Sequence, residues 1–234
     1  MPRLRNPNLA ILELAVERLG PLVDELVFLG GCATGLLLTD AAAPPIRATR
    51  DVDVITGVAS LHAYHQLSTQ LRKRGFREDQ SPEAPICRWT APGVVLDVMP
   101  TKPEILGFGN PWYQAALETA TPKTLPSGKI IQMVTAPYFL ATKLAAFDGR
   151  GRQDYAMSHD MEDVVAVLDG REEVITDIAH ADPDLRAHLA ARFQELLRDN
   201  RFVDALSGHL PGDEGSQARM PLLMERIQGI AEIE

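Results

Sequence analysis

Two acids alternate with β-branched residues in the segment TRDVDVI at residues 49–55. Residues i and i+2 of a β-strand point to the same face, so Asp51 and Asp53 project together, roughly 6–7 Å apart along the chain. Two carboxylates at that spacing repel each other unless a cation lies between them, and oxygen ligands suit Mg²⁺ or Mn²⁺. This alternation therefore predicts a strand that carries a divalent-cation site on one face.

A second apolar segment, residues 94–99, carries one acid, Asp97, in otherwise hydrophobic sequence. Three acids on buried strands make Asp51, Asp53 and Asp97 candidate metal ligands and candidate catalytic residues. Asp97 would complete the site next to the group that makes the nucleophilic attack, either as a metal ligand or as the acceptor of that group's proton. The competing interpretations are acids on the surface of strands, a Ca²⁺ loop, or the Asp-x-Asp motif of glycosyltransferases that use a sugar nucleotide.

Glycines and polar residues that precede this first strand are candidates for nucleotide binding. Gly30 and Gly31 follow an apolar run at residues 26–29 and open a helix, where backbone N–H groups and the helix dipole favour phosphate. Tight packing of a strand-to-helix turn explains the same glycines equally well. Thr49 is a candidate for contact with phosphate or ribose, or for pairing within the strand, and Arg50 is an ambiguous candidate for contact with the nucleotide.

Hydrophobic periodicity divides the chain into an α/β half and a helical half. Residues 1–135 contain short apolar strands separated by helical segments and by turn signals, including hairpin turns at residues 90–93 and 126–128. From Pro137 onward, the pattern has the 3.6-residue spacing of amphipathic helices. We therefore predict an α/β core over residues 1–135 and a C-terminal helical domain over residues 136–234.

Charge is distributed unevenly between these halves. Residues 136–234 supply the whole formal net charge of −9, because basic and acidic residues balance in the first half. An acidic surface is a poor general binder of nucleic acid, since attraction to phosphate drives non-specific affinity. Basic residues of the first half are candidates for contact with triphosphate or RNA, and for Arg72 to Arg77 a solvated helix end is the alternative. These basic residues are Arg47, Arg50, Arg72, Lys73, Arg74, Arg77 and Arg88.

Two features of the sequence bear on the cellular compartment. Cys32 and Cys87 are the two cysteines, and their apolar contexts fit buried thiols in a reducing cytoplasm better than a disulfide framework. No apolar run approaches about 18 residues, and the N-terminal segment lacks an apolar signal core. We therefore expect a cytoplasmic protein with no membrane partner.

Taken together, these residues resemble the AbiEii-like branch of the nucleotidyltransferase superfamily, whose members share the polymerase-β palm and include toxins of toxin–antitoxin pairs. The resemblance rests on the glycine pair, on the block Arg-x-Thr-x-Asp-h-Asp-h at residues 47–54, in which h is apolar, on Asp97, and on a lysine followed by a paired-acid helix. Many members have Gly-Ser at the turn where this chain has Gly30-Gly31. The resemblance implies a palm-like mixed sheet with flanking helices, followed by a C-terminal helical bundle.

The same resemblance implies a catalytic and nucleotide-binding role for Lys143, which would reach the triphosphate. Its spacing places it on one stripe with Phe139 and Phe147, where an amine among aromatic rings would otherwise extend to water. Asp160 and Asp163 lie three residues apart on one helix face. Either acid would orient Lys143 or contact the nucleotide, although acids at a helix N-terminus are ordinary in themselves.

These observations predict a Mg²⁺- or Mn²⁺-dependent nucleotidyltransferase that moves a nucleotide from NTP to a hydroxyl. The resemblance implies RNA as the acceptor, such as the acceptor end of tRNA, and an antitoxin as protein partner of a toxin component. Two alternatives stay open. One is an Asp-x-Asp glycosyltransferase, and the other is a non-catalytic domain that binds a nucleotide or a partner and in which loss of the serine has ended catalysis.

Overall fold

The computed structural model describes residues 6–150 and 154–233, which form two compact units. Each unit has its own core of buried aliphatic and aromatic side chains. The sheet unit comprises Pro7–Ala33 and Arg47–Thr135. Among the described residues, the helical unit comprises Asn6, Thr34–Ile46 and residues 136–150 and 154–233.

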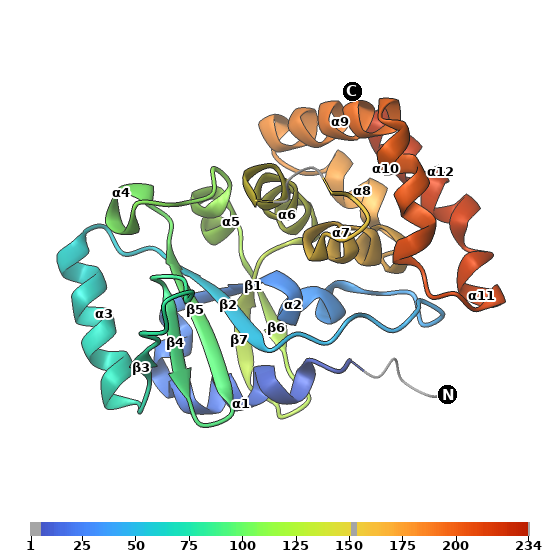
Figure 1. The fold of residues 1–234 in the computed structure, drawn as a ribbon. Helices are drawn as coiled ribbons and strands as arrows, with labels where there is room; N and C mark the ends of the chain where they lie inside the picture. The colour runs from blue at the N-terminus through green and yellow to red at the C-terminus, as the bar shows by residue number, and fades with distance from the viewer. Residues whose placement is uncertain (1–5, 151–153, 234) are drawn as a thin grey trace. The chain divides into compact units, whose positions relative to one another are not determined.

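Within the described residues, the sheet unit contains one seven-stranded sheet in the order β3-β4-β5-β2-β1-β7-β6 (Figure 1). β2 pairs in parallel with β5, and β1 pairs in parallel with β7, whereas the other neighbours are antiparallel. This mixed sheet with flanking helices confirms the predicted α/β (α+β) class. The strands are β1 (Leu26–Leu29), β2 (Asp51–Thr56), β3 (Arg77–Glu78), β4 (Arg88–Ala91), β5 (Val94–Pro100), β6 (Thr121–Thr124) and β7 (Ile130–Met133).

β2 shows the alternation that its sequence predicts. Val52 and Val54 are buried, whereas Asp51 and Asp53 are half-buried, because neighbouring side chains of a strand point to opposite faces. α1 (Leu9–Leu19) packs against β2 and β5 with an apolar stripe at helical spacing. Apolar packing therefore anchors the centre of the sheet, while one face of β2 presents its acids partly to solvent.

The other helices of the sheet unit lie in the connections between strands or, for η1, between α1 and β1. α3 (Leu61–Lys73) begins after Ser60, whose Oγ accepts a hydrogen bond from the N–H of Ala63 at 3.2 Å. The Tyr64 hydroxyl donates to the Val98 carbonyl at 3.0 Å and so fixes α3 against β5. Periodicity does not predict the short helices, because a single turn shows no repeat. They are η1 (Gly20–Glu25), α4 (Pro103–Leu106) and α5 (Tyr113–Glu118).

The two predicted hairpins are confirmed. β4 and β5 pair antiparallel around a turn at Gly93, and β6 and β7 do so around a turn at Gly128. Both glycines have positive φ, of 79° and 82°, which glycine adopts without the steric cost that other residues meet. The turn residues therefore fix where these strands fold back.

The helical unit is built from the amphipathic segments that the 3.6-residue spacing predicts. α6 packs on α7 and α9, and α12 packs on α7, α8 and α9, so their apolar stripes share one core. α2 (Gly30–Leu37) begins in the sheet unit and its second half belongs to the helical unit. The helices are α6 (Ala136–Arg150), α7 (His159–Gly170), α8 (Val174–Ala179), α9 (Pro183–Arg198), α10 (Asn200–Ala205), η2 (Leu206–His209), α11 (Glu214–Gln217) and α12 (Met220–Ala231).

A cluster of ion pairs explains why residues 34–46 belong to the helical unit. Arg219 donates to the Asp40 carboxylate at 2.6 Å and to the Asp169 carboxylate at 2.8 and 2.9 Å. Arg226 donates to the carbonyls of Leu168 and Asp169 at the end of α7. Because Asp169 is buried, these arginines neutralise a carboxylate that would otherwise be costly, and they tie the segment after α2 to α7 and α12.

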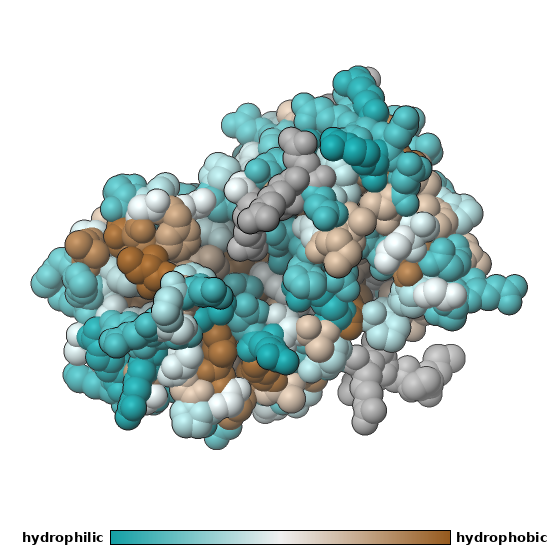
Figure 2. Space-filling view, in the orientation of Figure 1, coloured by the Kyte–Doolittle hydropathy of each residue, from teal (hydrophilic) through white to brown (hydrophobic). Residues whose placement is uncertain are grey.

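In the part of the chain that the structure describes, no helix combines the length and the apolar character needed to cross a bilayer. Hydrophilic residues predominate on the face drawn in Figure 2, and hydrophobic ones gather on the sheet unit around α4.

Candidate functional site

The three acids predicted from the sequence lie on two neighbouring strands. In the parallel pair of β2 and β5, Asp53 lies opposite Asp97 and Asp51 lies opposite Val95. Residues opposite each other in a ladder project from the same face, so Asp51, Asp53 and Asp97 share one face of the sheet. Asp97 is buried, with 7% of its surface exposed, whereas Asp51 and Asp53 are half-buried. Strand pairing therefore gathers the acids that the sequence separates.

Arg88 binds two of these acids. Its Nε donates to Asp97 Oδ1 at 2.8 Å and its Nη2 donates to Asp97 Oδ2 at 2.7 Å, while Nη2 also lies 3.2 Å from Asp51 Oδ2. This is a bidentate interaction, in which two N–H groups of the planar guanidinium bind the two oxygens of one carboxylate. Hydrogen bonding to Asp97 raises the pKa of Arg88, and the nearby Asp51 charge acts in the same direction. The acidic cluster therefore contains a permanent internal cation.

Gly30 and Asp53 are in direct contact. Gly30 follows β1 and opens α2 with φ of +73°, in the left-handed region that glycine tolerates. A Cβ placed on Gly30 would lie 1.8 Å from Asp53 Oδ2 and 2.7 Å from Asp53 Cβ. The tight-packing interpretation of this glycine is therefore correct for Gly30, and its contact with phosphate stays a prediction.

Asn8 holds the glycine turn and the entry to β2 together. Its side chain is fully buried, and its Nδ2 donates to the carbonyls of Gly31 at 3.2 Å and Arg47 at 3.1 Å. Its Oδ1 accepts the N–H of Thr49 at 2.9 Å. Sequence reasoning missed this residue, because an asparagine one position before α1 is the ordinary signature of an N-cap, whereas here the side chain makes no cap hydrogen bond.

Thr49 and Arg50 lie immediately before β2. The Thr49 hydroxyl donates to Asp51 Oδ1 at 2.5 Å, so Thr49 positions a carboxylate and does not pair within the strand. Arg50 is exposed, and no ion pair of its side chain is present among the described residues. Together with Asn8 and Arg88, Thr49 leaves Asp51 with a defined orientation.

Lys143 lies in the helical unit on α6 and is buried between two acids of α7. Its Nζ is 3.1 Å from Asp160 Oδ1 and 2.7 Å from Asp163 Oδ2, and it lies 5.9 Å from the ring centroid of Phe139. The alternative in which the amine extends to water does not hold, because the amine is buried and the paired acids compensate its burial. Its contact with the triphosphate stays a prediction. The structure thus gives Asp160 and Asp163 the orienting contact, and the N-cap of α7 is Ser158, whose Oγ accepts the N–H of Met161.

The donor chemistry of the sheet cluster fits a hard divalent cation, and Asp51, Asp53 and Asp97 would hold it. All the candidate donors are carboxylate oxygens on rigid strands, which are the ligands that Mg²⁺ and Mn²⁺ prefer. With Arg88 in place, however, the side chains of the described residues bring no three His, Cys, Asp or Glu groups together at metal-holding geometry. The carboxylates of Asp97 and Asp51 point at the guanidinium instead.

The cysteines play no nucleophilic part near this cluster. Both thiols are buried and free. Burial, with the Asp97 charge, raises the pKa of Cys87 to about 12, and burial together with the charges of Asp53 and Asp51 raises the pKa of Cys32. Both therefore stay protonated near neutral pH, as the sequence predicted for small buried hydrophobes.

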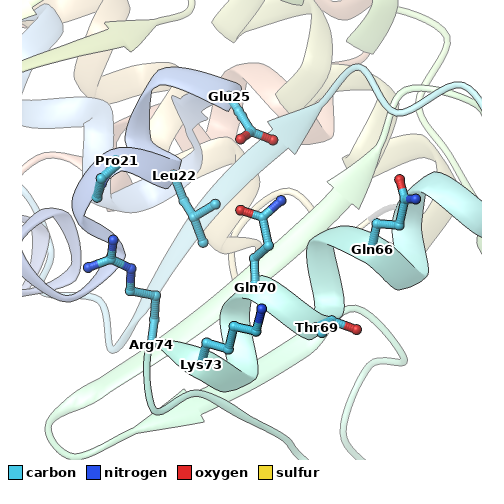
Figure 3. A pocket seen from close by; sticks show the side chains of 8 residues that line it. All are labelled: Pro21, Leu22, Glu25, Gln66, Thr69, Gln70, Lys73 and Arg74. Carbon is cyan, nitrogen blue, oxygen red and sulfur yellow. The ribbon is translucent and has the colours of Figure 1, made fainter.

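A separate pocket of about 710 Å³ lies in the sheet unit between η1 and the end of α3 (Figure 3). At its edge, the Arg74 guanidinium approaches Gly20, where a Cβ would lie 2.6 Å from Arg74 Nη1. None of the acids of the cluster lines this pocket, so it does not contain the candidate site. Its lining residues are Pro21, Leu22, Glu25, Gln66, Thr69, Gln70, Lys73 and Arg74.

No protein-family model and no curated protein matches the sequence. Among solved structures, the chain is similar to an antigenic nucleotidyltransferase-like protein from Paracoccidioides brasiliensis, with 20% identity, a TM-score of 0.48, and coverage of 89% of this chain and 95% of that one. It is also similar to JHP933 from Helicobacter pylori, with 14% identity, a TM-score of 0.49, and coverage of 96% of this chain and 92% of that one. Neither likeness assigns a role to a residue of this chain.

Proposed function

We propose that this protein transfers a nucleotide from an NTP to a hydroxyl acceptor at the face formed by β2 and β5. The observation that carries the proposal is the register of these strands, which sets Asp53 beside Asp97 with Asp51 on the same face. Like charges directly opposite each other destabilise a sheet, so their presence in its centre favours a role in binding a cation. Packing alone does not account for them.

Each residue of the cluster has a part in this proposal. Asp51, Asp53 and Asp97 hold the divalent cation, which when bound lowers the pKa of an attacking hydroxyl and neutralises leaving pyrophosphate. Asp97, which accepts two hydrogen bonds from Arg88, is the candidate acceptor for the proton of the acceptor hydroxyl. Thr49 fixes the rotamer of Asp51 through its hydroxyl.

The remaining predicted residues would bind the nucleotide. Gly30 and Gly31 carry no side chain of their own at the start of α2, where the helix dipole favours an anion. Arg50 is exposed next to Asp51 and can meet a phosphate. The sequence resemblance supports a nucleotide-binding and catalytic role for Lys143, whose Nζ lies 3.1 Å from Asp160 Oδ1 within the helical unit. RNA as the acceptor, and a toxin role with an antitoxin partner, are parts of the proposal supported by the sequence resemblance.

A labelling assay tests the transfer. The protein is incubated with Mg²⁺, each of the four α-labelled NTPs and a broad RNA pool, and labelled RNA is measured for the native chain, for Asp53→Asn and for Asp79→Asn. Asp79 is a half-buried acid outside the cluster that caps a turn at Ser81, and it serves as the matched control. We expect Asp53→Asn to lose at least about 100-fold of the activity and Asp79→Asn to keep it. Absence of labelling with every NTP, or full activity of Asp53→Asn, contradicts the proposal.

A non-catalytic nucleotide-binding domain is the second candidate function, and the pairing of Arg88 with Asp97 and Asp51 favours it. An arginine that neutralises the acids permanently would leave a binding site without the cation needed for transfer. Titration calorimetry with each NTP separates the two candidates, because tight binding without metal-dependent turnover supports the second. The glycosyltransferase alternative requires only Asp51 and Asp53, and saturable binding of a UDP-sugar without binding of NTP would favour it.

A further inference from the structure

We infer that Arg88 is the resident counter-cation of the Asp51, Asp53 and Asp97 cluster, and that a divalent cation binds there only by displacing the Arg88 guanidinium from Asp97 and Asp51. This inference rests on the cation site of the proposed function, and it does not depend on nucleotide transfer.

The position of Arg88 follows from the strand pairing. In the antiparallel pair of β4 and β5, Arg88 lies directly opposite Asp97, where cross-strand side chains meet. Cys87 and Trp89, which flank Arg88 in the chain, are both buried, and their packing anchors β4. The backbone of Arg88 is therefore fixed next to the acids, and the guanidinium reaches Asp51 across β5 from that fixed point.

The side chain itself can leave without a change in the strand. The Arg88 side chain is 25% exposed, compared with 9% for that of Asp97 and 36% for that of Asp51. A long, partly exposed arginine has several rotatable bonds and a solvent-facing route, whereas the carboxylates sit on the rigid centre of the sheet. Replacement of the guanidinium by a divalent cation then requires movement of the Arg88 side chain alone.

A guanidinium and a divalent ion compete for the same oxygens. Arg88 uses both carboxylate oxygens of Asp97 and one oxygen of Asp51, which are the lone pairs that a metal would need. Two positive charges within a few ångströms of each other would also repel. Binding of the metal therefore includes the cost of breaking charge-assisted hydrogen bonds, which weakens the apparent affinity by about 10- to 100-fold.

The test measures binding of Mn²⁺ alone, without nucleotide, by titration calorimetry and by electron paramagnetic resonance of the free ion. The variants are Arg88→Gln, which removes the charge, and Arg77→Gln, the matched control on β3, whose exposed arginine lies opposite Thr90 outside the cluster. We expect Arg88→Gln to bind Mn²⁺ about 10- to 100-fold more tightly than the native chain and Arg77→Gln to bind it as the native chain does. Addition of Asp53→Asn to Arg88→Gln should abolish the tight binding.

Unchanged or weaker Mn²⁺ binding by Arg88→Gln overturns the inference, as does an absence of Mn²⁺ binding in every variant. Circular dichroism checks folding, and if Arg88→Gln does not fold, Arg88→Lys replaces it. Lysine keeps the charge but loses the bidentate interaction, so Arg88→Lys should bind Mn²⁺ more tightly than the native chain, and equal affinity also overturns the inference. If Arg88→Gln binds Mn²⁺ more tightly but the native chain does not label RNA, the inference on Arg88 holds and nucleotide transfer is contradicted. If the native chain labels RNA but Arg88→Gln binds Mn²⁺ with unchanged affinity, transfer is supported and the inference on Arg88 is overturned.

Discussion

Replacement of Gly30 by alanine tests whether the turn between β1 and α2 is built around Asp53. The new Cβ would lie 1.8 Å from Asp53 Oδ2, 2.5 Å from Cγ and 2.7 Å from Cβ. A change of Asp53 rotamer relieves the contacts with Oδ2 and Cγ, but the Cβ of Asp53 is fixed to the backbone of β2. Relief of the whole clash therefore requires β2 and the turn to separate.

The expected loss of stability has two parts. The φ of +73° at Gly30 costs alanine about 1–2 kcal/mol. Overpacking against Asp53 adds about 1–3 kcal/mol, the range for an extra carbon in a filled site. Gly75→Ala separates the parts, because Gly75 has φ of +86° and a Cβ there would meet only open space. We therefore expect Gly30→Ala to cost about 1–3 kcal/mol more than Gly75→Ala.

Urea denaturation followed by tryptophan fluorescence measures this difference. Trp89 and Trp112, the two tryptophans of the chain, both lie in the sheet unit, so their emission reports the unfolding of that unit. In a double-mutant cycle, Asp53→Ala should recover part of the loss by removing Cγ and Oδ2. Equal free energies of unfolding for Gly30→Ala and Gly75→Ala, within about 0.5 kcal/mol, would refute the packing of Asp53 on Gly30.

Three further perturbations follow from the contacts described above. Asn8→Ala removes three hydrogen bonds to backbone groups, one buried and two partly buried, and should cost about 2–4 kcal/mol, with faster amide exchange at Thr49 as the local readout. Lys143→Met leaves two acids buried without their cation and should cost about 3–5 kcal/mol, measured by urea denaturation and circular dichroism at 222 nm; a loss below about 1 kcal/mol would contradict the buried pairing. The pKa of Cys87 rises from 9.0 to about 12 on folding, so its neutral form contributes stability that is complete below pH 9 and is lost as the pH rises toward about 12. Cys87→Ala should therefore flatten the alkaline decline by at most about 1.4 kcal/mol per pH unit, and an unchanged slope would show that the thiol is not the titrating group.

The sequence predicts those features of the fold and site that depend on local patterns. Alternation in one strand is a local property, and it correctly places Asp51 and Asp53 on one face of β2. The position of Asp97 beside Asp53 depends on strand order and register, because α3, β3 and β4 intervene along the chain before β5. No local pattern encodes that pairing, so the sequence identifies Asp97 as a candidate site residue but does not predict its position beside Asp53.

The partners of single polar residues are harder to predict for the same reason. Asn8 has the sequence context of an N-cap, yet its three hydrogen bonds go to residues 23 to 41 positions away. For Lys143, the aromatic stripe with Phe139 leaves open whether the amine extends to water or reaches the triphosphate. The two carboxylates of α7 that compensate its burial come beside it only when the helices pack. No local sequence feature distinguishes Arg88 from the other arginines of the first half.

The charged residues of the acidic cluster do not favour the stability of the sheet. A buried ion pair such as Arg88 with Asp97 usually contributes no more stability than apolar residues of similar size would. Asp53 opposite Asp97 is a like-charge pair across two central strands, which lowers the stability of the sheet. Alanine or valine at these positions would continue the apolar packing of β2 and β5, whose other residues are mostly buried. Stability therefore does not explain three acids and an arginine on this face, which supports the proposal that their charge serves a function.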